Sequence, residues 1–140
     1  MSILKLGQKK TYRIQKDAMA EFGYDLKFAM RGGYRLSDRD MVWFPNLSDS
    51  ENDEFDAPVG NVMKNEGRVL IELFSTERAY DRSLKYMTLK RITFARKRGE
   101  NYWFSGMYIY DGADKSTLRI KYRRVDTEVD TDNHKCARIN

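Results

Sequence analysis

Residues 86–125 decide the fold of this chain, and they read YMTLKRITFARKRGENYWFSGMYIYDGADKSTLRIKYRRV. β-Branched and aromatic residues fill three runs, which are separated by RKRGEN at 96–101 and by DGADKS at 111–116. Both separators have the glycine and polar content that is typical of turns between strands. The stretch therefore predicts a three-stranded antiparallel meander.

Most of the positive charge of the chain lies in this meander. Between Lys85 and Arg124 there are 11 lysines and arginines and 3 aspartates and glutamates, which gives 11 − 3 = +8, whereas the whole chain carries +5. The isoelectric point is near 9.3. A basic protein favours polyanionic partners, so we predict that the chain binds DNA or RNA, or nucleotides.

The last run of the meander, residues 118–123, alternates between apolar and basic residues. Side chains of a strand point alternately to its two faces, so Arg119, Lys121 and Arg123 are expected to share one face. Such a face is either a solvated outer surface or a stripe that follows phosphates. We name these three residues as candidate nucleic-acid contacts.

The middle run, YWFSGMYIY at 102–110, is apolar or aromatic on both faces and is expected to be the central strand. Its tyrosine hydroxyls need partners if they are buried, and Gly106 leaves a gap among large rings. These features favour a surface on which a base stacks. Trp103 and Tyr108 are the candidate stacking residues, although either ring could instead belong to the core.

In the first run of the meander, the apolar positions shift from odd to even residue numbers. Met87 and Leu89 are odd-numbered, whereas Ile92 and Phe94 are even-numbered. Either a bulge near residues 90–91 turns Arg91 relative to its neighbours, or the strand starts later. Arg91 is a further candidate nucleic-acid contact.

The chain before the meander predicts a helix. Residues 11–22 place apolar side chains on one helical face, and Gly23 fits a left-handed helix stop. Residues 59–66 allow one further helical turn, whereas residues 76–83 are expected to form a polar connector.

Two strands are also predicted before the meander. Residues 40–47, DMVWFPNL, form a short strand that Pro45 ends. Trp43 within it is either core or part of a pocket, and we name it as a candidate nucleic-acid-binding residue. Residues 68–75, RVLIELFS, have the β-branched and aromatic content of a strand.

The 140 residues suffice for a single domain. We predict one β-rich domain over residues 1–131 and a disordered tail over residues 132–140. No run approaches the roughly 20 apolar residues of a membrane span, and the N-terminus shows no secretion signal. The only cysteine is Cys136, which excludes an internal disulfide. A reducing cytoplasm is the expected compartment.

The residue types needed for common active sites are missing or badly spaced. The only histidine, His134, lies in the predicted tail, which argues against histidine triads and zinc sites. Residues 32–33 are a glycine pair without the spacing of a phosphate or dinucleotide loop. The acidic run at 48–56 lacks the glycine and the last glutamate of a calcium loop. We therefore expect an exposed acidic loop, no catalytic residues, no cofactor and no metal.

Two patterns in the meander resemble a known group of domains. Residues 102–108 have the pattern Y-x-F-x-G-x-Y, and residues 120–125 have the pattern I-x-Y-R-R-V. The stretch of about forty residues that contains both patterns is similar to the C-terminal block of small PUA-like β-domains that are appended to bacterial helicases and restriction-type nucleases. The resemblance implies a curled sheet or barrel with one or two helices, and a pocket or groove for a base, since some members read modified bases.

The sequence thus predicts an α+β fold, mainly an antiparallel sheet curled into a partial barrel of the PUA-like kind, with one or two helices. The predicted function is a non-enzymatic module that binds nucleic acid or nucleotides, with a reader of modified bases in phage defence or restriction as its most specific form. Two alternatives stay open. One is a small phage or mobile-element protein that inhibits a host enzyme by protein–protein contact, and the other is a protein that sequesters a nucleotide.

Overall fold

The computed structural model describes residues 2–25, 32–49 and 60–135. The predicted acidic loop falls largely on residues 50–59 and Cys136 falls on 136–140, so these two predictions lie outside the described residues. In the described ranges, no helix is long and apolar enough to cross a membrane.

Strands dominate the described residues. They are β1 (Ile3–Lys5), β2 (Gly33–Arg35), β3 (Asp40–Trp43), β4 (Asn46–Leu47), β5 (Gly60–Lys64), β6 (Val69–Leu73), β7 (Lys90–Lys97), β8 (Trp103–Asp114), β9 (Arg119–Asp126) and β10 (Glu128–Asp130). The helices are α1 (Gln15–Ala20) and α2 (Glu77–Leu84), with short 3-10 turns η1 (Asn65–Gly67) and η2 (Thr131–His134).

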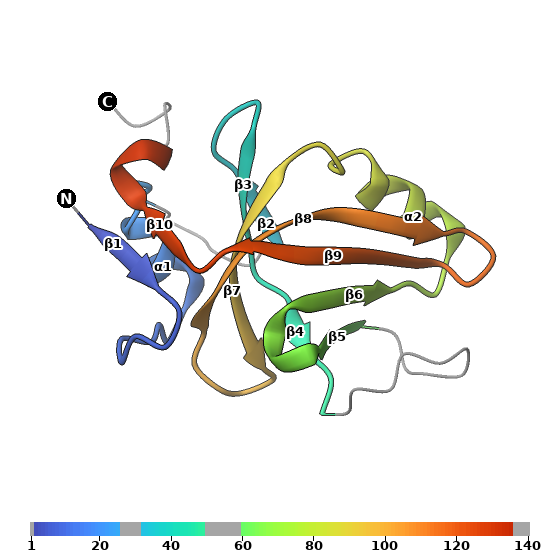
Figure 1. The fold of residues 1–140 in the computed structure, drawn as a ribbon, viewed down its shortest axis with the longest axis horizontal. Coiled ribbons are helices and arrows are strands. Elements are labelled where there is room, and N and C mark those ends of the chain that lie inside the picture. The colour runs from blue at the N-terminus through green and yellow to red at the C-terminus, as the bar shows by residue number, and fades with distance from the viewer. Residues whose placement is uncertain (1, 26–31, 50–59, 136–140) are drawn as a thin grey trace.

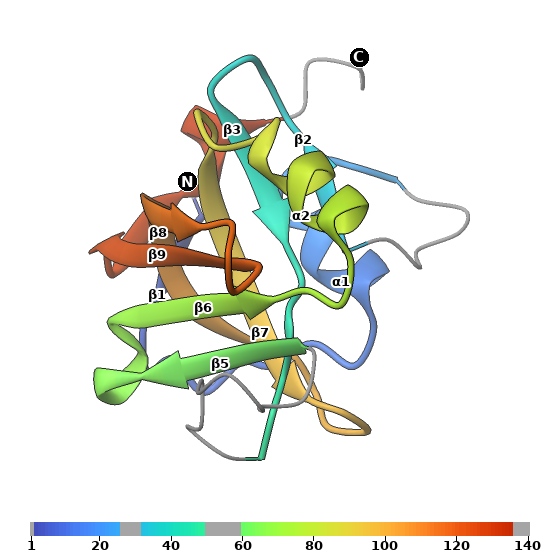
Figure 2. The same ribbon diagram turned by 90° about the vertical axis from the view of Figure 1, so that its right-hand side faces the viewer.

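Six of the strands close into a barrel (Figures 1 and 2). Hydrogen-bonded neighbours run in the order β7, β4, β5, β6, β9 and β8, and a further pairing between β7 and β8 completes the ring. The β2–β3 hairpin extends the sheet because β3 pairs in parallel with β7. Closing a sheet on itself removes its exposed edges. The α+β class and the curled sheet predicted from the sequence are therefore confirmed.

The predicted meander is made of β7, β8 and β9, which pair antiparallel in chain order. Because β7 begins at Lys90, the change of phase in the sequence reflects a later strand start. The register shift lies between Thr93 and Phe94. Gly106 has φ 118°, and a Cβ at this position would lie 2.4 Å from Cδ of Arg124. The gap among the rings is therefore filled by β9.

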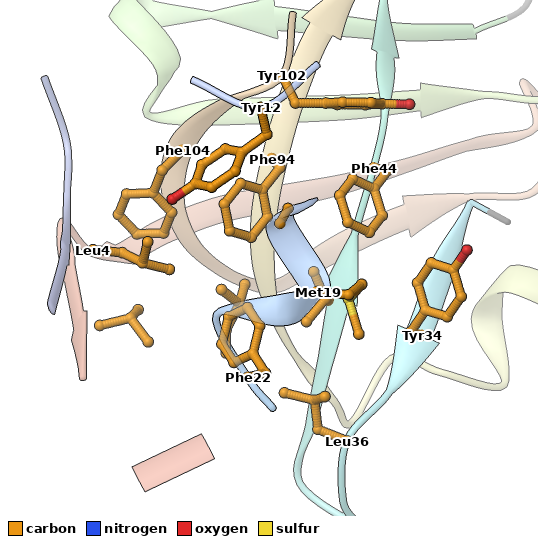
Figure 3. Close-up of a cluster of buried hydrophobic side chains, with 14 of the residues drawn as sticks. Leu4, Tyr12, Met19, Phe22, Tyr34, Leu36, Phe44, Phe94, Tyr102 and Phe104 are labelled. Carbon is orange, nitrogen blue, oxygen red and sulfur yellow. The ribbon is translucent and has the colours of Figure 1, made fainter. Parts of the chain in front are cut away.

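The two faces of β7 belong to two different cores. On the outer face, Ile92 and Phe94 pack with α1 in the first core, which Figure 3 shows around the helix. The ring of Phe94 has its centroid 5.2 Å from that of Tyr12 and 5.7 Å from that of Phe44. Edge-to-face and offset contacts at such distances stabilise aromatic clusters.

The second core fills the barrel. Its fully or nearly buried members come from β3, β6, β8, β9, α2 and the turn before β7, namely Met41, Trp43, Leu70, Tyr80, Leu89, Tyr108, Ile120 and Tyr122. The helix α2 lies close to β2 and β3 (Figure 2), and residues of all three elements line the same cavity. The barrel interior is thus rich in rings whose polar ends need partners, and this is where the candidate site lies.

The helices differ from the prediction in length and number. The predicted helix of residues 11–22 is shorter, because Ile14 already has an extended backbone and caps α1. Gly23 has φ 73° and ends this segment as predicted. The residues predicted as a polar connector form α2 instead. Thr76 starts it by accepting a hydrogen bond from the Ala79 amide at 3.1 Å, and within α2 only Tyr80 is buried.

Most of the helical turn that the sequence allowed over residues 59–66 is replaced by strand. Gly60–Lys64 make β5, which pairs antiparallel with β6, Val62 is buried in a small third cluster, and the 3-10 turn η1 begins only at Asn65. The hairpin between the two strands turns through Asn65 and Glu66, both of which have positive φ. This local backbone conformation is rare for non-glycine residues and could not be read from the composition.

The first part of the predicted tail has contacts with the domain. The His134 Nδ1 atom lies 2.8 Å from the Asp40 Oδ2 atom, and Lys135 donates a hydrogen bond to the Glu21 carbonyl at 3.1 Å. Residues 132–135 therefore differ from a free extension, because they join α1 and the start of β3. Residues 136–140 lie outside the described part, and the predicted domain boundary stays a prediction.

Removing residues 132–140 should lower the melting temperature. The truncation leaves Asp40 without its His134 partner and removes the Lys135 hydrogen bond, which together cost about 1–2 kcal/mol, or about 3–6 °C for a domain of this size. Thermal unfolding of the truncated and full chains would measure the difference. Ending the chain at Lys135 is the matched control because it keeps both contacts. An unchanged melting temperature after the longer truncation would show that these contacts contribute nothing.

Candidate functional site

A cavity of about 510 Å³ opens between the β2–β3 hairpin, β6, α2 and the start of β7. This volume lies in the range of about 300–1,000 Å³ that small-molecule sites occupy. The residues that line it are Gly32, Gly33, Arg35, Met41, Trp43, Glu72, Phe74, Ala79, Arg82, Ser83, Tyr86, Leu89 and Arg91. Apolar walls with a few polar groups are the usual composition of a ligand site.

Arg91 is the most unusual residue in this lining, because a buried arginine is rare. Only 3% of it is exposed. Its guanidinium carbon lies 4.7 Å from the ring centroid of Trp43 and 4.2 Å from that of Tyr122. The two rings lie 5.1 Å apart at 55° and form a V-shaped cleft around the cation. Cation–π contacts of this kind hold the guanidinium plane in one orientation.

Glu72 supplies the opposite charge. Its Oε1 atom accepts hydrogen bonds from the Ser83 hydroxyl at 2.9 Å, from Nη1 of Arg91 at 3.5 Å and from the Tyr122 hydroxyl at 2.5 Å. Burial, helped by the negative charge of Glu72, raises the pKa of Tyr122 well above its ordinary value. The phenol therefore stays protonated and remains a donor.

Two polar atoms of this cluster have capacity left. The Nε atom of Arg91 is buried and has no hydrogen-bond partner within the described part of the chain. All three donors to Glu72 converge on Oε1, so Oε2 accepts no hydrogen bond from any described residue. Buried polar atoms are nearly always paired in proteins. The buried Nε atom of Arg91 therefore calls for a ligand or water as its partner, whereas Oε2 belongs to a partly exposed side chain and is an acceptor that the described residues leave unused.

Positive charge surrounds the mouth of the cavity. Arg35 and Arg82 line it, and the exposed Lys85 lines an adjoining hollow on α2 together with Arg82. Arg35 is paired with Asp38 at 3.3 Å, whereas no ion pair within the described residues neutralises Arg82 or Lys85. A cationic rim of this kind attracts phosphates.

Two of the residues predicted from the sequence, Trp43 and Arg91, meet in this cavity. Tyr108 does not join them. Its ring is fully buried, and its hydroxyl donates to the carbonyls of Gly67 and Ser105 at 2.5 and 3.2 Å. Burial raises the pKa of Tyr108. Neither face of this ring is open to a base, so we assign it to the barrel core.

Trp103 lies at the other end of the barrel. It is half-buried and lines a second hollow of about 440 Å³, together with Leu47, Met63 and Lys97. Lys97 ends β7, whereas Arg91 is close to the start of this strand. Six residues of strand extend over about 20 Å, so Trp103 and the cavity form separate surfaces.

The basic stripe of β9 has the predicted alternation, but it points away from the cavity. Ile120 and Tyr122 are buried in the barrel, so Arg119, Lys121 and Arg123 lie on the outer face of the strand. Lys121 and Arg123 both lie 3.7 Å from a carboxylate oxygen of Asp111. The predicted contacts therefore divide into a pocket and an outer stripe on opposite faces of one sheet.

Sequence reasoning missed the residues that complete the cavity. Ser83, Arg82 and Tyr86 come from α2 and the turn after it, a helix that was not predicted. Glu72 had a signal, because it is a carboxylate in the middle of the apolar strand VLIEL. Three or more histidine, cysteine or acidic side chains do not gather into a metal site anywhere in the described ranges.

Comparisons with known proteins agree with this geometry. The sequence matches the family model of the SRA domain, the SET and RING associated domain, over residues 4–131. The structure is similar to that of the 5-hydroxymethylcytosine-specific restriction enzyme AbaSI, with a TM-score of 0.71 and 26% sequence identity. The similarity covers 91% of this chain and 42% of that chain, so this chain spans less than half of that enzyme. A search of curated proteins found no match.

These findings confirm the resemblance to PUA-like domains that are linked with restriction-type nucleases. The family match begins in β1 and ends at the first residue of η2. It therefore includes the barrel, both α-helices and every residue that lines the cavity. The chain belongs to the SRA domain family.

Proposed function

We propose that this chain binds DNA and reads a modified cytosine, without cutting the DNA itself. SRA domains bind modified cytosine in DNA, and AbaSI is specific for 5-hydroxymethylcytosine. A base inside a duplex cannot reach a protein pocket, so the nucleotide has to rotate out of the stack. The cavity lined by Trp43, Glu72 and Arg91 would receive it.

The polar pair at the bottom of the cavity is the observation that carries this proposal. Cytosine has an exocyclic amine that donates hydrogen bonds and ring acceptors beside it. Glu72 offers an acceptor, and Arg91 offers donors in an orientation that Trp43 and Tyr122 hold. One base edge can therefore pair with both side chains, whereas a purely apolar pocket would not distinguish the bases.

A titration of duplexes that differ at one cytosine would test the proposal. The three duplexes carry cytosine, 5-methylcytosine or 5-hydroxymethylcytosine at the same position, and binding is measured by fluorescence polarisation at two salt concentrations. We expect at least about tenfold tighter binding to a modified duplex, on the scale of one good base contact. Equal affinity for all three duplexes would contradict base reading. Absence of binding would favour the protein–protein alternative.

The cationic rim should set the salt dependence of binding. Replacing Arg82 and Lys85 with glutamine should weaken binding to all three duplexes equally and reduce the salt slope by about 0.9 for each phosphate that the protein no longer neutralises. The matched variant replaces Arg119 and Lys121, which removes the same charge on the outer face of β9. If the salt slope falls only in this second variant, the duplex binds the outer basic face of β9 and not the cationic rim of the cavity.

A further inference from the structure

We infer that Glu72 decides which group on carbon 5 of the cytosine the cavity accepts. The inference rests on the function proposed above, and it names the selected class. A neutral substituent that donates a hydrogen bond, such as hydroxymethyl, is favoured. A formyl group, which only accepts, and a carboxylate, which is negative, are rejected.

The first step is the asymmetry of the Glu72 carboxylate. An ionised carboxylate has two acceptor oxygens with about four lone-pair sites. Ser83, Arg91 and Tyr122 all donate to Oε1, which leaves Oε2 without a donor among the described residues. Glu72 lines the cavity, and 13% of its side chain is exposed. One oxygen is thus used by the protein, and the other is the acceptor left for a ligand.

The second step is that the carboxylate is held in place. Ser83 approaches it from α2, Tyr122 from β9 and Arg91 from β7. Contacts from three different elements restrict the rotamer, and a side chain locked in this way can discriminate small differences in a ligand. Because two of the three donors are hydroxyl groups, only Arg91 offsets the negative charge of Glu72.

The third step is the chemistry of the base. The exocyclic amine and the carbon-5 substituent are neighbours on the cytosine ring, so one carboxylate oxygen near that edge meets both. A hydroxymethyl group can donate its O–H to Oε2, whereas a methyl group donates nothing. A formyl oxygen would place an acceptor against an acceptor, and a carboxylate would place two negative charges together in a largely desolvated site.

The other charged residues at the cavity would favour a different order of affinities for the modified bases, which makes the inference testable. Arg35 and Arg82 also line the cavity, and they would attract a carboxylate. If these cations governed selection, 5-carboxylcytosine would bind most tightly. If Glu72 governs it, the affinity falls from hydroxymethyl to methyl, then to formyl, and is lowest for carboxyl.

The experiment compares four duplexes that carry one 5-hydroxymethyl-, 5-methyl-, 5-formyl- or 5-carboxylcytosine at the same site. They are titrated with the wild-type chain, with Glu72→Gln and with the control Glu128→Gln, which removes the same charge from an exposed residue of β10, outside the cavity. Glu72→Gln should reduce the preference for hydroxymethyl over carboxyl by about tenfold to a hundredfold, the range of a charged hydrogen bond. Glu128→Gln should keep the wild-type order of affinities.

The outcomes separate this inference from the proposed function. If wild type binds every modified duplex better than unmodified DNA, but Glu72→Gln keeps the same order, Glu72 does not select and the reader function stands. If wild type does not distinguish modified from unmodified DNA, the reader function itself fails. Melting curves show whether Glu72→Gln is folded. If Glu72→Gln is unfolded, the affinities of the wild-type chain still test the inference. Tighter binding of the 5-carboxylcytosine duplex than of the 5-hydroxymethylcytosine duplex would overturn it.

Discussion

Replacing Arg91 with alanine should lower the free energy of unfolding by about 3–5 kcal/mol, the usual cost when one partner of a buried ion pair is removed. The substitution leaves the largely buried carboxylate of Glu72 beside two hydroxyl groups and without its cation. It also empties the cleft between Trp43 and Tyr122. Chemical denaturation would measure the change, and any folded fraction should lose its preference for the modified duplex.

A second substitution separates the two causes of this effect. Adding Glu72→Gln to Arg91→Ala removes the unpaired charge, so the double variant should be more stable than the sum of the single changes predicts. Lys97→Ala is the control, because this residue is exposed on the same strand and should change stability by less than about 0.5 kcal/mol. A decrease below about 1 kcal/mol for Arg91→Ala would mean that solvent screens the pair and that the two charges do not depend on each other for stability.

Phe94→Ala should lower the free energy of unfolding by about 3–5 kcal/mol, as other large-to-small changes in a core do. The ring is fully buried and lies within 6.2 Å, centroid to centroid, of the rings of Tyr12, Phe22, Phe44 and Phe104. No other ring in the described residues has four such neighbours. Its removal leaves a cavity between α1 and the barrel wall.

The control for Phe94 is Tyr86→Ala, since Tyr86 is 42% exposed and its truncation should cost less than about 0.5 kcal/mol. Binding separates the two variants further. Folded Phe94→Ala should read DNA normally, because Phe94 faces away from the cavity. Tyr86 lines the cavity, so its removal should affect binding more than stability. The reverse pattern would show that the two cores are not independent.

The sequence predicted the parts of the fold that local patterns encode. Three aromatic runs separated by glycine turns indicated the meander, and Gly23 marked the end of a helix correctly. The helix α2 was missed because its apolar side is short: Tyr80 is buried, and Leu84, four residues later, is only partly buried against the same core. β5 was missed because its neighbour β6 and the turn at residues 65–67 hold it in place, and neither is a property of its own residues.

The site was predicted only in part, for a related reason. Arg91 and Trp43 were candidates for their residue types, and a parallel pairing of β3 with β7 brings them together. The pairing of strands so distant in the chain has no signal in a single sequence. A strict alternation along β8 places Tyr108 and Trp103 on opposite faces, but the register shift beside Thr93 and Phe94 puts both on the face that pairs with Arg91 and Ala95. Tyr108 lies there in the core, and Trp103 lies at the far end of the barrel.

The position of β7 also has a consequence for how the chain reaches this structure. β7 pairs with β8 nearby in sequence, but it also pairs in parallel with β3 and β4, and the partner of Lys90 is Asp40. Contacts between residues so far apart close long loops, and chains dominated by such contacts fold slowly, on the scale of milliseconds to seconds. The meander can assemble early, whereas Trp43 reaches Arg91 only when β3 docks. The cavity should therefore be among the last features to form during refolding, and Trp43 fluorescence should lag behind the appearance of β-structure.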